Sequence, residues 1–148
     1  MSRHFQPLTI RDVRRETNDC VSISFDVPSA LADSFRFIAG QYVNLRARVD
    51  GEELRRSYSI CSAPRSSELR VAIKRVEGGA FSAFANSKLK IGDVIDVMPP
   101  DGKFCFAPQA DANQNVLAVA AGSGITPIVS IVTTLLEESP RSNVTLVY

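Results

Sequence analysis

Apolar and polar residues alternate along much of the first two thirds of the chain. The alternation runs through residues 21–27, 43–49 and 69–74, and a period of two is the signature of a strand with one buried face. Residues 94–98 form a further strand-like run, and Asp50-Gly51 is a strong hairpin signal. Strands at this spacing, with turn residues between them, predict an antiparallel β-barrel or a sandwich.

One short helical pattern interrupts the strands. Residues 80–86 follow Gly78-Gly79, and Phe81 and Phe84 stand three apart, on one helix face. Glycines before a helix let its first backbone N–H groups converge on an anion. A turn that needs a positive φ, followed by an unrelated helix, explains the same residues.

The pattern changes beyond the strand-rich region. Residues 115–121 are continuously apolar, as in a strand that is buried on both faces. A glycine turn then leads into a predicted helix over residues 128–138, with Thr126 as its N-cap and Pro127 as its first residue. Residues 143–148 read as a second strand, which completes a β-α-β unit.

We therefore predict two domains. Residues 1–107 would form the β-barrel, and residues 108–148 the opening of an α/β nucleotide-binding domain. A single β-α-β unit of about forty residues leaves apolar faces of its helix and strands uncovered. We expect the chain to be a fragment, or to lack a half that another chain supplies, and the uncovered faces could support self-association.

Composition and charge exclude several classes of function. The 148 residues are 45% hydrophobic, which is enough for a real core, and 17 basic against 16 acidic residues give a net charge of +1. Without a basic stripe, we expect no nucleic-acid partner. The longest apolar run, residues 116–121, is too short to cross a bilayer, and the N-terminal residues lack the apolar core of a signal peptide. We therefore expect no membrane partner and a cytoplasmic location.

Cysteine and histidine usage argues against a metal site. Cys20, Cys61 and Cys105 are widely spaced and form no C-x-x-C motif. This spacing argues against a disulfide framework, a zinc site or an iron–sulfur cluster held by this chain alone. His4 is the single histidine of the sequence. We therefore expect no metal ligands, and we expect a cofactor to carry any reaction.

The most informative stretch is residues 55–60, Arg-Arg-Ser-Tyr-Ser-Ile. In a strand, Arg56 and Tyr58 share a face and stand about 7 Å apart. One cofactor could then place a phosphate on the guanidinium and a flat ring against the phenol. Ser59 could offer a hydrogen bond to a polar ring edge. An ordinary solvated strand explains the same six residues.

A third motif lies between the strand and the helix of the predicted α/β domain. Gly122-x-Gly124-x-x-Pro127 departs from the dinucleotide-binding fingerprint at its last position, where proline replaces glycine. Taken alone, it is explained by a tight strand-to-helix turn.

Together and in this order, the three motifs resemble the ferredoxin–NADP reductase superfamily. The resemblance covers the whole chain and includes residues 35–43, which are similar to the family's segment ending in Pro-Gly-Gln. Ala39 stands where proline is usual, so we expect a looser turn there. The resemblance is closest to the reductase components of bacterial phenylacetyl-CoA monooxygenases (epoxidases), through residues 50–61, 76–79 and 120–127.

The resemblance implies a role for each matched residue. Arg56 would bind the FAD pyrophosphate, Tyr58 would pack on the isoalloxazine, and Ser59 would hydrogen-bond near its reactive nitrogen. Thr126 would reach toward the flavin, so that Tyr58, Ser59 and Thr126 act at the reaction centre. The implied cofactor-binding set is Arg56, Ser57, Tyr58, Ser59, Ala72, Ile73, Lys74, Gly78, Gly79, Ala80, Phe81, Ser82, Gly122, Gly124 and Thr126.

The implied reaction is hydride transfer from the substrate NAD(P)H to FAD. Single electrons would then pass to a [2Fe–2S] centre and on to an oxygenase component. The [2Fe–2S] domain and the rest of the nicotinamide domain would lie outside this chain. We therefore expect the chain to bind FAD without efficient NAD(P)H turnover. The alternative is a β-barrel binding or interaction module with no redox role.

Overall fold

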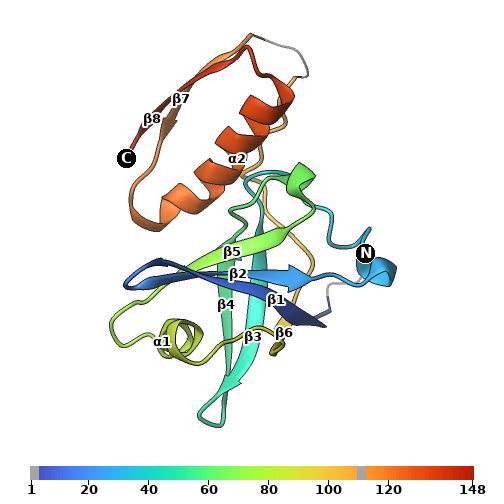
Figure 1. Cartoon of the computed structure of the whole chain (residues 1–148), viewed down its shortest axis with the longest axis vertical. Coiled ribbons are helices and arrows are strands. Elements are labelled where there is room, and N and C mark those ends of the chain that lie inside the picture. Colours follow the sequence, from blue (N-terminus) through green and yellow to red (C-terminus); the bar gives the residue numbers. More distant parts are fainter. Residues whose placement is uncertain (1–3, 110–112) are drawn as a thin grey trace.

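The computed structural model describes residues 4–109 and 113–148. Figure 1 shows two parts, a barrel of antiparallel strands and a smaller unit in which helix α2 lies beside strands β7 and β8. A mainly β architecture followed by a β-α-β unit confirms the predicted fold class. The placement of the domain boundary near residue 107 stays a prediction.

Six strands form the barrel. They are β1 (Gln6–Thr17), β2 (Cys20–Asp26), β3 (Tyr42–Val49), β4 (Glu52–Ser59), β5 (Leu69–Lys74) and β6 (Val94–Val97). Their order is β4-β3-β6-β1-β2-β5, and all neighbours are antiparallel. Because β6 inserts between β3 and β1, the connections cross in the Greek-key manner. The edge strands β4 and β5 meet through a bridge between Ile60 and Val71, which closes the barrel at that corner.

Alternating apolar side chains fill the barrel, as the sequence pattern predicts for β2, β3, β5 and β6. The pattern does not reveal β1, because a register shift between Ile10 and Asp12 breaks its alternation. The buried core includes Leu8, Ile10, Val21, Ile23, Phe25, Val43, Leu45, Val71, Ile73, Ile95 and Val97.

Helix α1 (Ala80–Ser87) packs on the barrel and begins where the sequence predicts. Phe81 is fully buried in the core, and Phe84 packs beside it with ring centroids 6.4 Å apart. Gly78 adopts φ +69°, a backbone conformation that glycine reaches without a side-chain clash. Gly79 is the residue before the first helical turn.

The α/β part consists of β7 (Asn115–Val119), α2 (Ile125–Glu138) and β8 (Asn143–Val147), with the two strands parallel. The expected helix start was wrong. A 3₁₀ turn over Gly122–Gly124 runs directly into α2, so the helix begins at Ile125 and Gly124 precedes it. Thr126 is therefore inside the first turn instead of being the N-cap. Pro127 is the third helical residue, which is tolerated because first-turn N–H groups have no partner within a helix.

The expectation that residues 115–121 are buried on both faces was also wrong. Ala118 is buried, but Leu117 and Val119 on the opposite face are 68% and 65% exposed. Helix α2 covers one face of the two-stranded sheet, and the described residues supply no second cover. Val147 extends the exposed apolar face onto β8. Self-association through this face stays a prediction.

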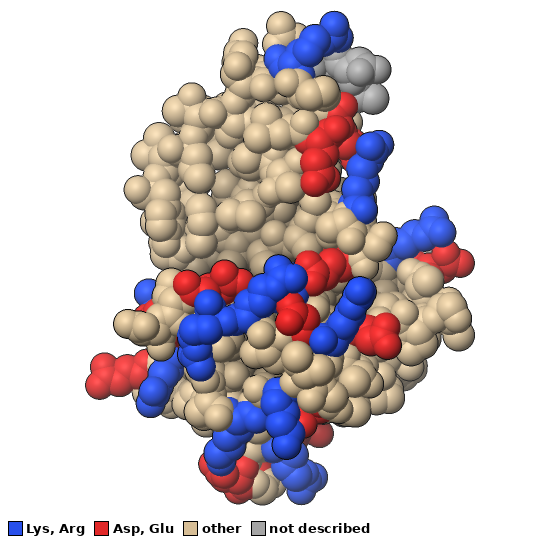
Figure 2. Space-filling view, in the orientation of Figure 1, with Lys and Arg blue, Asp and Glu red and all other residues tan. Residues whose placement is uncertain are grey.

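Helix α2 contacts the barrel near the loop that follows β4. Ser130 Oγ donates to the carbonyl of Ser62 at 2.7 Å, and Arg65 pairs with Glu138 at 3.4 Å. Figure 2 shows basic and acidic side chains interleaved over the barrel, whereas the visible face of the α/β part is largely uncharged. No helix in the described ranges is long and apolar enough to span a membrane.

Candidate flavin site

Strand β4 holds Arg56 and Tyr58 on one face, as the strand period predicts. Their cross-strand partners, Leu45 and Val43, are both buried, so this face continues the barrel interior at the edge of the sheet. Tyr58 is half-buried and packs against Phe81 of α1, with ring centroids 5.8 Å apart. The side chain of Arg56 is exposed. A guanidinium, an aromatic ring and a helix therefore meet at this edge.

The environment of Tyr58 keeps its phenol neutral. Burial raises the pKa of Tyr58 to about 12, and the nearby Arg56 guanidinium lowers it by a smaller amount. The phenol is therefore protonated throughout the physiological pH range. A neutral ring beside an exposed guanidinium can receive a flat heterocycle and a phosphate at the same time.

Ser57 and Ser59 lie on the opposite face of β4. The Ser57 hydroxyl donates to Oδ1 of Asn44 at 2.6 Å, which holds it within the sheet. Ser59 is half-buried and pairs with Tyr42. The two serines therefore lie beside the Arg56–Tyr58 face but not on it, and a hydrogen bond from Ser59 to a ring at Tyr58 stays a prediction.

The turn before α1 has the geometry of an anion site. The first internal helical bond runs from the N–H of Ala83 to the carbonyl of Gly79 at 2.9 Å, so the N–H groups of residues 80–82 precede the helical ladder. These groups lie at the positive end of the helix dipole. An open depression of about 560 Å³ adjoins the turn and is lined by Asp19, Arg75, Val76, Glu77, Gly78, Gly79, Ala80 and Ala83.

Two predicted members of this turn can contribute only backbone. The ring of Phe81 is buried in the core, and the Ser82 hydroxyl is used inside the turn. Ser82 Oγ accepts from the N–H of Val76 and donates to the carbonyl of Gly79, both at 3.0 Å. A Cβ on Gly79 would stand 2.6 Å from that hydroxyl oxygen, so a side chain there would push the hydroxyl out of its two bonds.

Strand β5 offers backbone to the same region. It pairs with β2 along its length, and it meets the end of β4 at the Ile60–Val71 bridge, where the Cys61 N–H donates to the Arg70 carbonyl at 2.9 Å. The side chain of Ile73 is buried in the core, and Lys74 lies 3.4 Å from Asp19 as an exposed ion pair. Because backbone groups alternate along a strand, those of Ala72 and Lys74 face the β4 side, whereas those of Ile73 face Val21 of β2.

The glycine loop before α2 is exposed. Gly122 adopts φ +52°, and Gly124 is exposed beside it. Thr126 is half-buried, and its hydroxyl donates to the carbonyl of Ser123 at 2.9 Å. In this structure the hydroxyl is thus engaged within its own loop, and a role of Thr126 toward a flavin stays a prediction.

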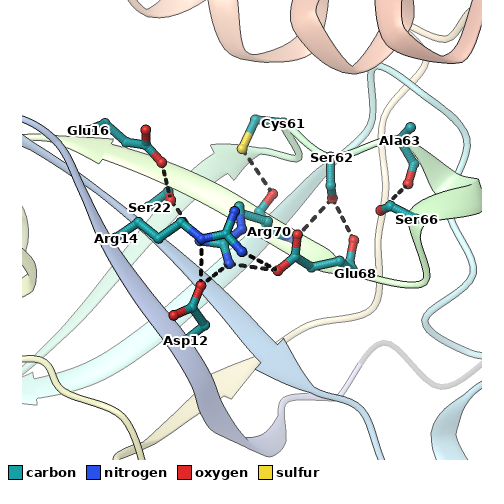
Figure 3. A network of polar contacts seen from close by, with 10 residues as sticks. All are labelled: Asp12, Arg14, Glu16, Ser22, Cys61, Ser62, Ala63, Ser66, Glu68 and Arg70. Carbon is teal, nitrogen blue, oxygen red and sulfur yellow. Dashed lines mark hydrogen bonds and ion pairs between the residues drawn. The ribbon is translucent and has the colours of Figure 1, made fainter.

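Sequence reasoning missed a buried polar network beside the junction of the two parts. Arg70 has a side-chain exposure of 6% and donates to Ser22, Asp12 and Glu68 (Figure 3). The partners come from separate strands and the loop before β5, so no local pattern connects them. The available signal was a charged residue between Leu69 and Val71 in an otherwise apolar strand.

Residues 7–106 match the family described as "Oxidoreductase FAD-binding domain". The chain belongs to this family. A component of 1,2-phenylacetyl-CoA epoxidase from Escherichia coli (strain K12) is 46% identical over 144 residues, which cover 97% of this chain and 40% of that protein. The ferredoxin reductase component of 3-ketosteroid-9-alpha-monooxygenase from Rhodococcus rhodochrous is 36% identical over 143 residues, covering 95% and 40%. The chain spans about two fifths of the length of these relatives.

Solved structures agree with the fold. The FAD/NAD-binding domain of nitric oxide dioxygenase from Vibrio cholerae has a TM-score of 0.77 at 23% identity, covering 97% of this chain and 62% of that chain. A ferredoxin NADP+ reductase from Neisseria gonorrhoeae, solved with bound FAD and NADP, has a TM-score of 0.69 at 24% identity, covering 99% and 58%. The family match and these neighbours confirm the resemblance to the ferredoxin–NADP reductase superfamily.

Proposed function

We propose that this chain is the FAD-holding part of an NAD(P)H-dependent electron-transfer reductase. The observation that carries the proposal is that Arg56 and Tyr58 share one face of β4. Tyr58 also packs on helix α1, and the first N–H groups of that helix have no acceptor within it. The site offers two places for phosphate and one aromatic surface for a flat ring. Family membership supports FAD as the cofactor that matches this set.

Each part of the site has a definite task in this proposal. Arg56 and the backbone of residues 79–82 hold the pyrophosphate, the neutral ring of Tyr58 supports the isoalloxazine, and Ser59 orients its polar edge. Residues 72–74 of β5 line the path between ring and phosphates. Bound FAD supplies the chemistry of accepting a hydride and releasing single electrons. The protein contributes orientation and a partly water-excluded ring site.

The hydride donor and the electron acceptor are further parts of the proposal. Gly122, Gly124 and Thr126 would receive the nicotinamide nucleotide, with NAD(P)H as substrate. Electrons would leave for an iron–sulfur centre outside this chain and then for an oxygenase component in the cytoplasm. The support is that two relatives are named as parts of an epoxidase and of a monooxygenase. By similarity, phenylacetyl-CoA degradation is the pathway that we propose.

Replacing Arg56 with alanine should weaken FAD binding by about 1.5–3 kcal/mol, because a charged hydrogen bond to phosphate is lost. Quenching of FAD fluorescence on titration with protein measures the dissociation constant. Arg55→Ala is the matched control, since Arg55 is also exposed but faces away and pairs with Glu53 at 2.7 Å. Equal losses in the two variants would remove Arg56 from the site.

The same titration tests the competing function. If the unmodified chain stays colourless after dialysis against FAD, the redox proposal fails and a β-barrel binding module becomes the better interpretation. A yellow protein whose affinity depends on Arg56 supports the reductase. The two outcomes are separated before any assay with a nicotinamide nucleotide.

A further inference from the structure

Asn86 is a buried amide near the end of α1. It is 8% exposed, and its Nδ2 donates to two backbone carbonyls, those of Ile73 and Ser82, each at 2.9 Å. Ile73 belongs to β5, whereas Ser82 belongs to the first turn of α1. One side chain therefore connects the helix to the neighbouring strand.

The orientation of this amide is fixed by Arg15 of β1. The guanidinium of Arg15 donates to Asn86 Oδ1 at 3.3 Å and to the Asn86 carbonyl at 2.8 Å. Because a guanidinium has no acceptor, the oxygen of the amide must face Arg15. The nitrogen then faces the two carbonyls of Ile73 and Ser82, which also have no hydrogen to give. Every contact of the amide is satisfied in one orientation alone.

The two carbonyls belong to the two backbone segments that the proposed function assigns to FAD. Ile73 lies within residues 72–74 of β5 and is paired with Val21 of β2, and Ser82 closes the glycine turn through its bonds to Val76 and Gly79. The Asn86 amide thus sets the spacing between β5 and the helix start. Among neutral side chains of this size, an amide alone supplies two N–H donors from one nitrogen.

We propose that Asn86 is a positioning residue that selects the dinucleotide FAD over the mononucleotide FMN. The inference rests on the proposed function of the same site. The helix start and residues 72–74 of β5 would together hold the FAD pyrophosphate and the chain leading to it, so the affinity for FAD would depend on the spacing of these two segments. FMN lacks the second phosphate and the adenosine half, and it therefore depends less on that spacing.

The test compares dissociation constants for FAD and FMN in the whole chain. Asn86→Leu keeps the number and branching of the side-chain heavy atoms and removes both donors, and it should weaken FAD binding about tenfold while changing FMN binding by less than about threefold. Ser87→Ala is the matched control on the same helix, because the exposed Ser87 hydroxyl, among the residues that the structure describes, bonds to the Ala83 carbonyl alone, at 2.7 Å. It should leave both constants unchanged.

Two further variants distinguish a general loss of stability from a specific effect on FAD binding. Ile95→Val removes one buried methyl group from β6, away from the site, and should lower Tm without changing the ratio of FAD to FMN affinity. Arg15→Met removes the guanidinium that holds the Asn86 amide oxygen. It should shift the ratio of FAD to FMN affinity in the same direction as Asn86→Leu does, so the test remains available if Asn86→Leu folds poorly.

The result that overturns the inference is a parallel loss of FAD and FMN affinity in Asn86→Leu, with the ratio of the unmodified chain retained. Unchanged FAD binding in both Asn86→Leu and Arg15→Met would overturn it as well. These outcomes differ from failure of the proposed function, in which the unmodified chain binds no FAD or Arg56→Ala has no effect.

Discussion

Replacing Arg70 with methionine is expected to lower the free energy of unfolding by about 3 kcal/mol at neutral pH. The buried guanidinium donates to Ser22 Oγ at 2.7 Å, to Asp12 Oδ2 at 2.5 Å and to Glu68 Oε1 at 2.6 Å. Methionine has a similar length but no donors, so two carboxylates and a hydroxyl lose the hydrogen bonds that they accept from Arg70. This loss of unfolding free energy is at the lower end of the range expected when a buried ion pair is broken, because both carboxylates keep some contact with water.

Urea unfolding followed by circular dichroism measures this effect, and Arg14→Met is its matched control. Arg14 lies 2.8 Å from the same Asp12 carboxylate and 3.8 Å from Glu68, but its side chain is 58% exposed. Solvent screening makes such a pair worth less than about 1 kcal/mol. If the two variants lose the same stability, burial of Arg70 is not the cause of its contribution.

The effect of Arg70→Met should shrink in acid. Hydrogen bonds from Arg70 are the largest cause that lowers the pKa values of Asp12 and Glu68 below their ordinary 3.8 and 4.5. A carboxyl with a lowered folded-state pKa stabilises the protein above its ordinary pKa and loses that contribution as pH falls through the lowered value. The gap between Arg70→Met and the unmodified chain should therefore be smaller at about pH 3 than at about pH 7.

Replacing Gly40 with alanine is expected to destabilise the chain by about 3–5 kcal/mol. Gly40 adopts φ +100°, where a side chain strains the backbone. A Cβ there would also overlap the carbonyl oxygen of Phe104 and stand 3.2 Å from Cδ1 of Ile131 on α2. The added methyl group must therefore displace the segment that leads from the barrel to the α/β part. Thermal and urea unfolding measure the loss.

Gly51→Ala separates backbone strain from this steric contact. Gly51 adopts φ +89°, but no heavy atom of the described residues lies within 4 Å of a Cβ built there. It should cost only the strain, about 1–2 kcal/mol. A Gly40→Ala variant no less stable than Gly51→Ala would show that the segment near Phe104 does not pack on Gly40 as described.

The flavin strand shows how far local pattern reaches. The period of a strand is enough to place Arg56 and Tyr58 on one face, and the structure has them there. The same period places Ser57 and Ser59 on the other face, so the four residues do not form one continuous surface. The contact between Tyr58 and Phe81 joins residues 23 positions apart and needed the packing of α1 onto the barrel.

Longer-range features escaped prediction for a common reason. The bulge in β1 hides that strand, and the buried network around Arg70 draws its partners from separate strands. The anchoring of α1 by Asn86 links that helix to β1 and β5. Each feature depends on which strands become neighbours, and that order is a property of the folded sheet.

The sequence by itself determined an antiparallel barrel or sandwich, the β-α-β unit, the glycine turn at Gly78 and the spacing of the flavin motif. These follow from periodicity and backbone freedom, which act over a few residues. Only the tertiary structure decided the strand order, the bridge that closes the barrel between β4 and β5, and the burial of Arg70 and Asn86. Those depend on contacts between distant segments, whose energies are set by packing and desolvation in the assembled fold.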